Sequence, residues 1–375
     1  AYQRMNASGR TYVGWNWNAG DTDGKTYTVK VVSDSGNKYR FDNFGTSAVT
    51  LDLAEGGTYI FNMDDSSNAS HPFSIGTAAN GTVYTSGITY FLDGVSKTYS
   101  QYTSGFSSAS TRRLHITVPA SAPQLYYWCS VHSGMGGAIN TNTTLGSSNF
   151  DGDTQATVKV NTTAGFSIVL FSGSGNRTIG HGLGVAPKAI IMKGRNVTDQ
   201  WTVGHEHLEA SNSWHKGQPL NSASANQDNA GFWNDTAPTS TVFHKGTWDD
   251  GYNMVAYCFS EVAGYSKFGG YAGNGNTRGT FVQTGFRPAL VMVKGIWGGN
   301  WNVYDNKRNS FNVVNRTLYP NLTNAESAES SSGNQMDFYS NGFKMRGSNQ
   351  DTNFNGERFI FLAFAESPFK YARAR

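Results

Sequence analysis

Four side chains able to bind a soft metal ion lie in two short segments of the chain. Cys129, His132 and Met135 follow one another at intervals of three residues, and His71 lies well upstream of them. Two imidazoles, a thiolate and a weak thioether ligand form a donor set that favours copper over harder cations. The residue types and their spacing therefore predict a metal site at His71, Cys129, His132 and Met135.

Strand-forming sequence precedes both segments. Residues 59–61 (Tyr-Ile-Phe) come before His71, and residues 125–127 (Leu-Tyr-Tyr) run directly into Cys129. Short runs of aromatic and β-branched residues predict strands. Further runs of this kind occur at residues 27–32, 51–53 and 114–118. Together they favour a Greek-key sandwich that carries the four donors at one end.

The composition is typical of an all-β protein with several domains. A length of 375 residues is natural for two or three domains. The 44 glycines make turns frequent, and aromatic residues at 14% supply strand formers, so long helices are not expected. The formal net charge of +3 gives no electrostatic argument for a nucleic-acid partner. No apolar run reaches the roughly 18 residues needed to span a bilayer, so no membrane partner is expected.

The second half of the chain contains an internal repeat. Pro187 and Pro288 stand in similar apolar runs, Trp201 and Trp301 occupy matching positions after them, and both pairs are about 100 residues apart. Units of this length, made of short strands and Gly- or Asn-rich turns, are typical of β-sandwiches. Residues 12–17 resemble the last strand of a unit, at 254–259. They predict a trace of a further copy.

These patterns divide the chain into four parts. Residues 1–22 are expected to hold the terminal strand of a preceding repeat unit, and residues 23–150 the Greek-key domain. Residues 151–263 and 264–375 are expected to be the two β-sandwich repeats. A stretch rich in Ser, Asn, Asp and Gly, residues 147–153, is expected to be a linker.

The first of these domains resembles the cupredoxins, the family of small blue-copper proteins. The resemblance rests on two motifs, His71-Pro72-Phe73 and Tyr127-x-Cys129-x-x-His132-x-x-Met135-Gly136-Gly137. It implies that His71, Cys129 and His132 form a trigonal plane around copper and that Met135 is the axial ligand. A second interpretation is a scaffold that keeps the same side chains packed without a metal.

The two repeats resemble tandem β-domains in tail fibres and other virion proteins of marine phages, a family without assigned chemistry. The resemblance rests on residues 256–269, 284–289, 304–308, 340–344 and 363–372. It implies concanavalin-like or jelly-roll sandwiches and a place on a virion assembled in the host cytoplasm. Such proteins assemble symmetrically, so we expect a homo-oligomer, with a trimer as first choice. Other virion proteins and host-surface glycans are the further partners expected.

Motifs for catalysis are absent from the sequence. It contains no nucleophile elbow, P-loop, Rossmann glycine pattern or metalloprotease helix motif. His205-Glu206-His207 is the most suggestive group, but Tyr304-Asp305-Asn306 stands at the matching place in the second repeat. Surface histidines without a catalytic role are therefore expected there.

The sequence thus favours a non-enzymatic virion structural protein: a tail fibre, an adhesin or a capsid decoration protein. Its copper would be structural. One alternative is a secreted, extracellular blue-copper protein that transfers electrons and carries carbohydrate-binding modules. Another is a carbohydrate-active enzyme, which requires two carboxylates facing each other across a cleft. No such pair stands out.

Overall fold

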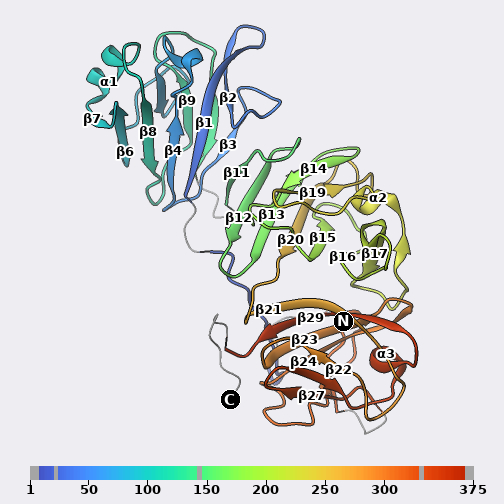
Figure 1. Ribbon diagram of the computed structural model, residues 1–375. Coiled ribbons are helices and arrows are strands. Elements are labelled where there is room, and N and C mark those ends of the chain that lie inside the picture. The colour runs from blue at the N-terminus through green and yellow to red at the C-terminus, as the bar shows by residue number, and fades with distance from the viewer. Residues whose placement is uncertain (1–7, 21–23, 142–145, 329–332, 368–375) are drawn as a thin grey trace.

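The computed structural model describes residues 8–20, 24–141, 146–328 and 333–367 (Figure 1). In these ranges β-strands dominate, and the longest helix, α1 (Tyr99–Gly105), has seven residues. The prediction of an all-β protein is confirmed. None of the helices in these ranges is long and apolar enough to cross a bilayer. Residues 368–372, the end of the last segment that resembles the phage domains, lie outside the described part.

The N-terminal group of strands, blue to teal in Figure 1, forms two sheets. Their orders are β2-β1-β4-β8-β6-β7 and β3-β10-β9-β5. β1 pairs in parallel with β4, and β3 with β10. The elements are β1 (Gly24–Ser33), β2 (Asn37–Phe41), β3 (Leu51–Asp52), β4 (Thr58–Asn62), a 3-10 helix (Ser66–Asn68), β5 (Phe73–Gly76), β6 (Ile88–Leu92), β7 (Val95–Lys97), α1, β8 (Arg112–Thr117), β9 (Leu125–Cys129) and β10 (Gly137–Asn140).

An aromatic core holds these two sheets together. Phe73 of β5 stacks on Phe61 of β4 with ring centroids 4.8 Å apart, and on Tyr127 of β9 at 5.5 Å. All three side chains are fully or almost fully buried. Period-2 alternation of inward aromatic residues places such rings on the inner faces of both sheets. Because Phe73 and Tyr127 belong to the strands next to the predicted metal ligands, this core also fixes the base of that site.

The first repeat is built on one sheet of order β11-β12-β13-β20-β15-β16-β17-β18, and β14 pairs with β19 separately. The elements are β11 (Ser147–Asn149), β12 (Ala156–Asn161), β13 (Phe166–Ser172), β14 (Arg177–Gly180), β15 (Ala189–Gly194), β16 (Thr202–His205), a 3-10 helix (Ser213–His215), β17 (Lys216–Pro219), β18 (Gln227–Asp228), α2 (Ala230–Trp233), β19 (Val242–Lys245) and β20 (Asn253–Phe259).

The second repeat contains sheets of order β21-β29-β23-β24, β22-β28-β27 and β25-β26. The elements are β21 (Ser266–Ala272), β22 (Phe281–Gln283), β23 (Pro288–Gly295), β24 (Gly298–Asp305), β25 (Arg316–Thr317), β26 (Ser327–Ala328), β27 (Met336–Tyr339), β28 (Gly342–Met345), α3 (Gln350–Asn353) and β29 (Arg358–Ala365).

The two repeats share their topology and some of their hydrogen bonds. The order β13-β20-β15-β16 in the first recurs as β21-β29-β23-β24 in the second. The Trp201 amide donates to Asn221 Oδ1 at 3.0 Å, and the Trp301 amide donates to Asn321 Oδ1 at the same distance. Equivalent positions about 100 residues apart therefore have the same local structure.

Residues 8–20 form no strand, although the sequence predicts one at 12–17. The side chains at odd positions, Trp15, Trp17 and Ala19, still face the protein, as the period-2 pattern requires. The Trp17 ring packs against both repeats. Its centroid is 5.9 Å from that of Phe259 in the first repeat and 5.3 Å from that of Phe364 in the second. Packing between the two repeats replaces the strand pairing that the alternation suggested.

Residues 147–150, the first part of the linker expected at 147–153, form a packed joint, whereas Asp151 and Asp153 are exposed. β11 is the edge strand of the first-repeat sheet, and all three of its residues are buried. The Tyr27 hydroxyl of β1 donates to the Ser148 carbonyl at 2.9 Å. Phe150 then enters the aromatic core of the N-terminal sheets, with its ring centroid 5.2 Å from Phe44 and 6.0 Å from Phe41. Polar residues fit here because their main-chain groups find partners.

Candidate metal centre

Two neighbouring strands carry the first pair of predicted ligands. β5 and β9 are antiparallel, with Phe73 opposite Cys129. His71 stands two residues before β5, and the Ser130 amide donates to the Pro72 carbonyl at 3.0 Å just beyond the ladder. Strands paired in this way hold the start of one next to the end of the other. His71 and Cys129 are therefore side by side although they are 58 positions apart in the sequence.

Three of the four predicted ligands form a cluster. Cys129 Sγ lies 3.8 Å from His71 Nδ1 and 3.7 Å from His132 Nδ1. One ligand atom from each of the three residues lies within 4.8 Å of the other two. An ion bonded at roughly 2.3 Å to a thiolate and 2.0 Å to an imidazole holds those two atoms about 3.7 Å apart when the bonds meet at about 120°. The observed separations fit a transition-metal ion in a trigonal arrangement.

The site has a buried side and an open side. Cys129 is 2% exposed and His71 7% exposed, whereas His132 is exposed to solvent. Burial, with the neighbouring His132 imidazole as a smaller cause, lowers the pKa of His71. The lowered pKa keeps His71 neutral near pH 7, and a neutral imidazole offers the lone pair that a metal ion needs.

Met135, the predicted axial ligand, is 1% exposed and belongs to the core of the N-terminal sheets. Its carbonyl accepts a hydrogen bond from the Tyr39 amide of β2 at 3.0 Å. The next residue must be glycine, since a Cβ on Gly136 would lie 1.6 Å from the Tyr127 carbonyl oxygen. The loop from Ser130 to Gly136 is thus closed tightly onto β2 and β9, with the Met135 main chain held in one place.

Tyr39 is a positioning residue that sequence reasoning missed. Its hydroxyl donates to the His71 carbonyl at 2.8 Å, and its ring packs on Phe73 with centroids 5.1 Å apart. Burial, with Cys129 close by, raises its pKa well above the usual value. Tyr39 therefore stays a neutral hydrogen-bond donor that supports both predicted ligand strands. In the sequence it is one inward aromatic residue among many, so no local signal marks it.

The histidines of the first repeat do not form a second metal centre. His71, Cys129 and His132 are the one metal-competent group of three or more His, Cys, Asp or Glu residues in the described ranges. His205, expected at the surface, is fully buried. Its Nε2 donates to the Phe361 carbonyl of the second repeat at 3.2 Å, and its Nδ1 accepts from the His207 amide at 3.1 Å. His205 thus has a structural role between the repeats.

The fold and site define an all-β protein with a repeated sheet topology and a metal-competent N-terminal cluster. The chain belongs to the family described as "Domain of unknown function (DUF7483)", whose model matches residues 135–368, more than half of the chain. No curated protein and no solved structure matches the chain. The matched region contains both repeats, the joint and β10. His71, Cys129 and His132 precede it.

Proposed function

We propose that this chain is a structural protein of a phage virion, with a cupredoxin-like domain that binds copper and β-sandwich repeats that serve assembly and attachment. Tail fibre, adhesin and capsid decoration protein are the roles that suit such a chain. The observation that carries the copper-binding part of the proposal is the cluster of Cys129 Sγ with the Nδ1 atoms of His71 and His132. No turnover is proposed.

Copper is the metal that the donor chemistry supports best. A thiolate and two imidazoles with a thioether nearby are the donors of a type 1 copper site, and zinc more often takes four strong ligands in a structural site. The parallel pairs β1–β4 and β3–β10, with ligands delivered by β5 and β9, support a cupredoxin-like arrangement. In this proposal His71, Cys129 and His132 hold the ion and Met135 is the weak fourth ligand.

A structural role for the metal follows from what the ligand loop is connected to. The loop continues directly into β10, whose Asn140 side chain donates to Asp52 Oδ1 at 2.8 Å. Asp52 Oδ2 in turn accepts from Thr157 Oγ1 of the first repeat at 2.5 Å. An ion that fixes the loop would therefore also stabilise the strand that bonds to the neighbouring domain.

The virion role is supported by the packed joint and the tandem repeats, which suit a rigid, repetitive building block. Symmetric self-association is the usual route by which such chains assemble, and we propose a trimer. The test is native mass spectrometry of the full chain together with elemental analysis of the same sample. A trimer that retains copper supports the proposal, whereas a copper-free monomer contradicts it.

Electron transfer is the second candidate function, and one observation favours it. His132 is exposed and the neighbouring Val131 is 64% exposed, so one metal ligand reaches the surface beside an apolar side chain. Chelation distinguishes the two roles. A structural ion should raise the melting temperature of the N-terminal sheets by several degrees. Unchanged melting after copper removal, together with reversible reduction of the loaded protein, would favour the redox role.

A further inference from the structure

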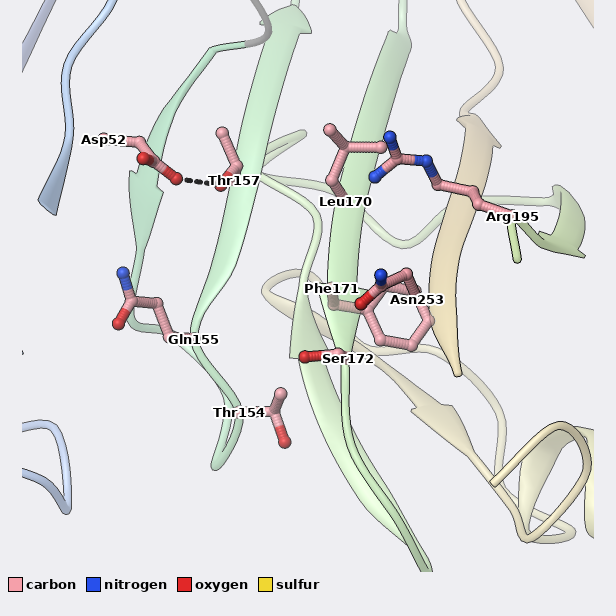
Figure 2. Close-up of a pocket in the computed structure, with 9 residues that line it drawn as sticks. All are labelled: Asp52, Thr154, Gln155, Thr157, Leu170, Phe171, Ser172, Arg195 and Asn253. Atoms are coloured by element: carbon pink, nitrogen blue, oxygen red, sulfur yellow. Dashed lines mark hydrogen bonds between the residues drawn. The ribbon is translucent and has the colours of Figure 1, made fainter. Parts of the chain in front are cut away.

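A polar cleft lies where the N-terminal sheets meet the first repeat. It has a volume of about 490 Å³, within the size range of ligand sites. β3 forms one wall, and the outer face of the β12, β13 and β20 sheet forms the other. Figure 2 shows its lining residues: Asp52, Thr154, Gln155, Thr157, Leu170, Phe171, Ser172, Arg195 and Asn253.

The two charged side chains of the cleft differ in their hydrogen-bond partners. Asp52 is held in place, since its carboxylate accepts from Thr157 and from Asn140. Arg195 follows β15, and its side chain extends toward Leu170 in Figure 2. In the part of the chain that the structure describes, the Arg195 guanidinium has no hydrogen-bond or ion-pair partner. The cleft therefore offers a fixed acceptor on one wall and an unpaired cationic fork on the other.

Further polar groups face the same space. Ser172 lies opposite Asn253 in the β13–β20 ladder, and both side chains are exposed. Gln155 uses its amide nitrogen on the Thr50 carbonyl and on Ser148 Oγ, at 2.7 Å and 3.1 Å, which leaves its amide oxygen available. Neutral donors and acceptors at these positions suit hydroxyl groups of a ligand.

The same sheet face continues to an aromatic pair. Val255 lies opposite Leu170, and Tyr257 is two residues further along β20. The side chains of Val255 and Tyr257 therefore point to this same face, and the two residues are roughly 7 Å apart along the strand. Tyr257 stacks with Trp201, with ring centroids 6.3 Å apart, and both rings are half-buried. Flat aromatic faces beside a polar cleft can pack against the apolar faces of a sugar ring.

We infer that this cleft binds a carboxylated saccharide, with a uronate carboxylate on Arg195 and sugar hydroxyls on Asp52, Ser172 and Asn253. A planar guanidinium pairs with a carboxylate through two parallel hydrogen bonds, which makes a uronate the best match for Arg195. Asp52 repels a carboxylate from its own wall, so the bound uronate turns its carboxylate toward Arg195. This inference rests on the attachment role proposed above and names the class of glycan.

The test is isothermal titration calorimetry of the full chain with tetragalacturonate at low ionic strength. A sulfated carrageenan tetrasaccharide and neutral maltotetraose are the comparison ligands. Arg195→Gln should weaken tetragalacturonate binding about tenfold or more, because one bidentate charged pair is lost. Arg278→Gln, which changes another exposed arginine far along the chain, should bind as the unmodified protein does.

The possible outcomes test the uronate site separately from the proposed virion role. Equal binding by the unmodified protein and Arg195→Gln overturns the inference. Binding of only the sulfated or the neutral tetrasaccharide overturns the uronate assignment and leaves glycan attachment standing. Failure to bind any of the three overturns the inference, while the assembly and copper content measured on the unmodified chain still test the virion role separately.

Discussion

Cys129 Sγ lies 3.8 Å from His71 Nδ1, and the antiparallel pairing of β5 with β9 produces this contact. The third donor, His132 Nδ1, is 3.7 Å from the same sulfur. Strand pairing thus places one imidazole and the short loop after β9 places the other. The Cys129 sulfur at the end of β9 is common to both contacts, so copper binding should depend most on Cys129.

Cys129→Ala should abolish the intense visible absorption that a copper–thiolate bond gives to the copper-loaded protein. Cys258→Ala is the matched control, because Cys258 is the other cysteine, is fully buried in the first repeat, and belongs to no metal-competent cluster in the described ranges. Visible spectra of both variants after copper loading and desalting provide the measurement. A band that survives in Cys129→Ala would show that the thiolate is not a ligand.

Gly136→Ala should disrupt the ligand loop. The added Cβ would lie 1.6 Å from the Tyr127 carbonyl oxygen, so the loop has to move away from β9. We expect a loss of copper affinity and a lower melting temperature of the N-terminal sheets. Gly45→Ala is the control, since a Cβ there meets no atom within 4 Å. Equal copper affinity and melting of the two variants would contradict the tight closure of the loop.

Phe150→Ala should weaken the joint between the N-terminal sheets and the first repeat. Phe150 is 4% exposed and packs on Phe41 and Phe44, and removal of a buried phenylalanine ring costs about 3–5 kcal/mol. Limited proteolysis should then cut near the joint faster than in the unmodified chain. Phe311→Ala, at a position 83% exposed, should leave the cleavage rate unchanged. A similar rate in all three proteins would indicate that residues 147–153 behave as a simple linker.

His205 should make the stability of the repeats depend on pH. Burial, reinforced by His207, lowers its pKa to about 3, whereas an unfolded histidine titrates near 6.5. The contribution of neutral, buried His205 to the free energy of unfolding is fully present above about pH 6.5. As the pH falls below 6.5, protonation of this histidine in the unfolded chain reduces that free energy by about 1.4 kcal/mol per pH unit.

The matching variant is His205→Gln, whose side-chain amide can still donate to the Phe361 carbonyl but does not titrate. Urea unfolding of both proteins, followed from neutral pH to about pH 4.5, should show a smaller loss of stability in the variant. The other histidines are the same in both proteins, so the difference isolates His205. Parallel pH dependences would show that His205 is not buried as a neutral group.

Local sequence was enough to predict some features. The place of His132 beside Cys129 follows from their spacing within one loop, and the all-β class follows from alternating aromatic runs. Other features depend on distant partners. Polar β11 is buried because Tyr27, 121 residues away, bonds to Ser148. His205 can be buried because the Phe361 carbonyl, 156 residues away, accepts a hydrogen bond from its imidazole N–H. No pattern in the sequence around Ser148 or His205 indicates these distant partners.

The most direct test of the metal site is X-ray absorption spectroscopy at the copper edge on the copper-loaded protein. We predict a short copper–sulfur bond together with two copper–nitrogen bonds from imidazole, and loss of the sulfur contribution in Cys129→Ala. Coordination by nitrogen and oxygen alone in the unmodified chain, with no sulfur neighbour, would contradict the site formed by His71, Cys129 and His132.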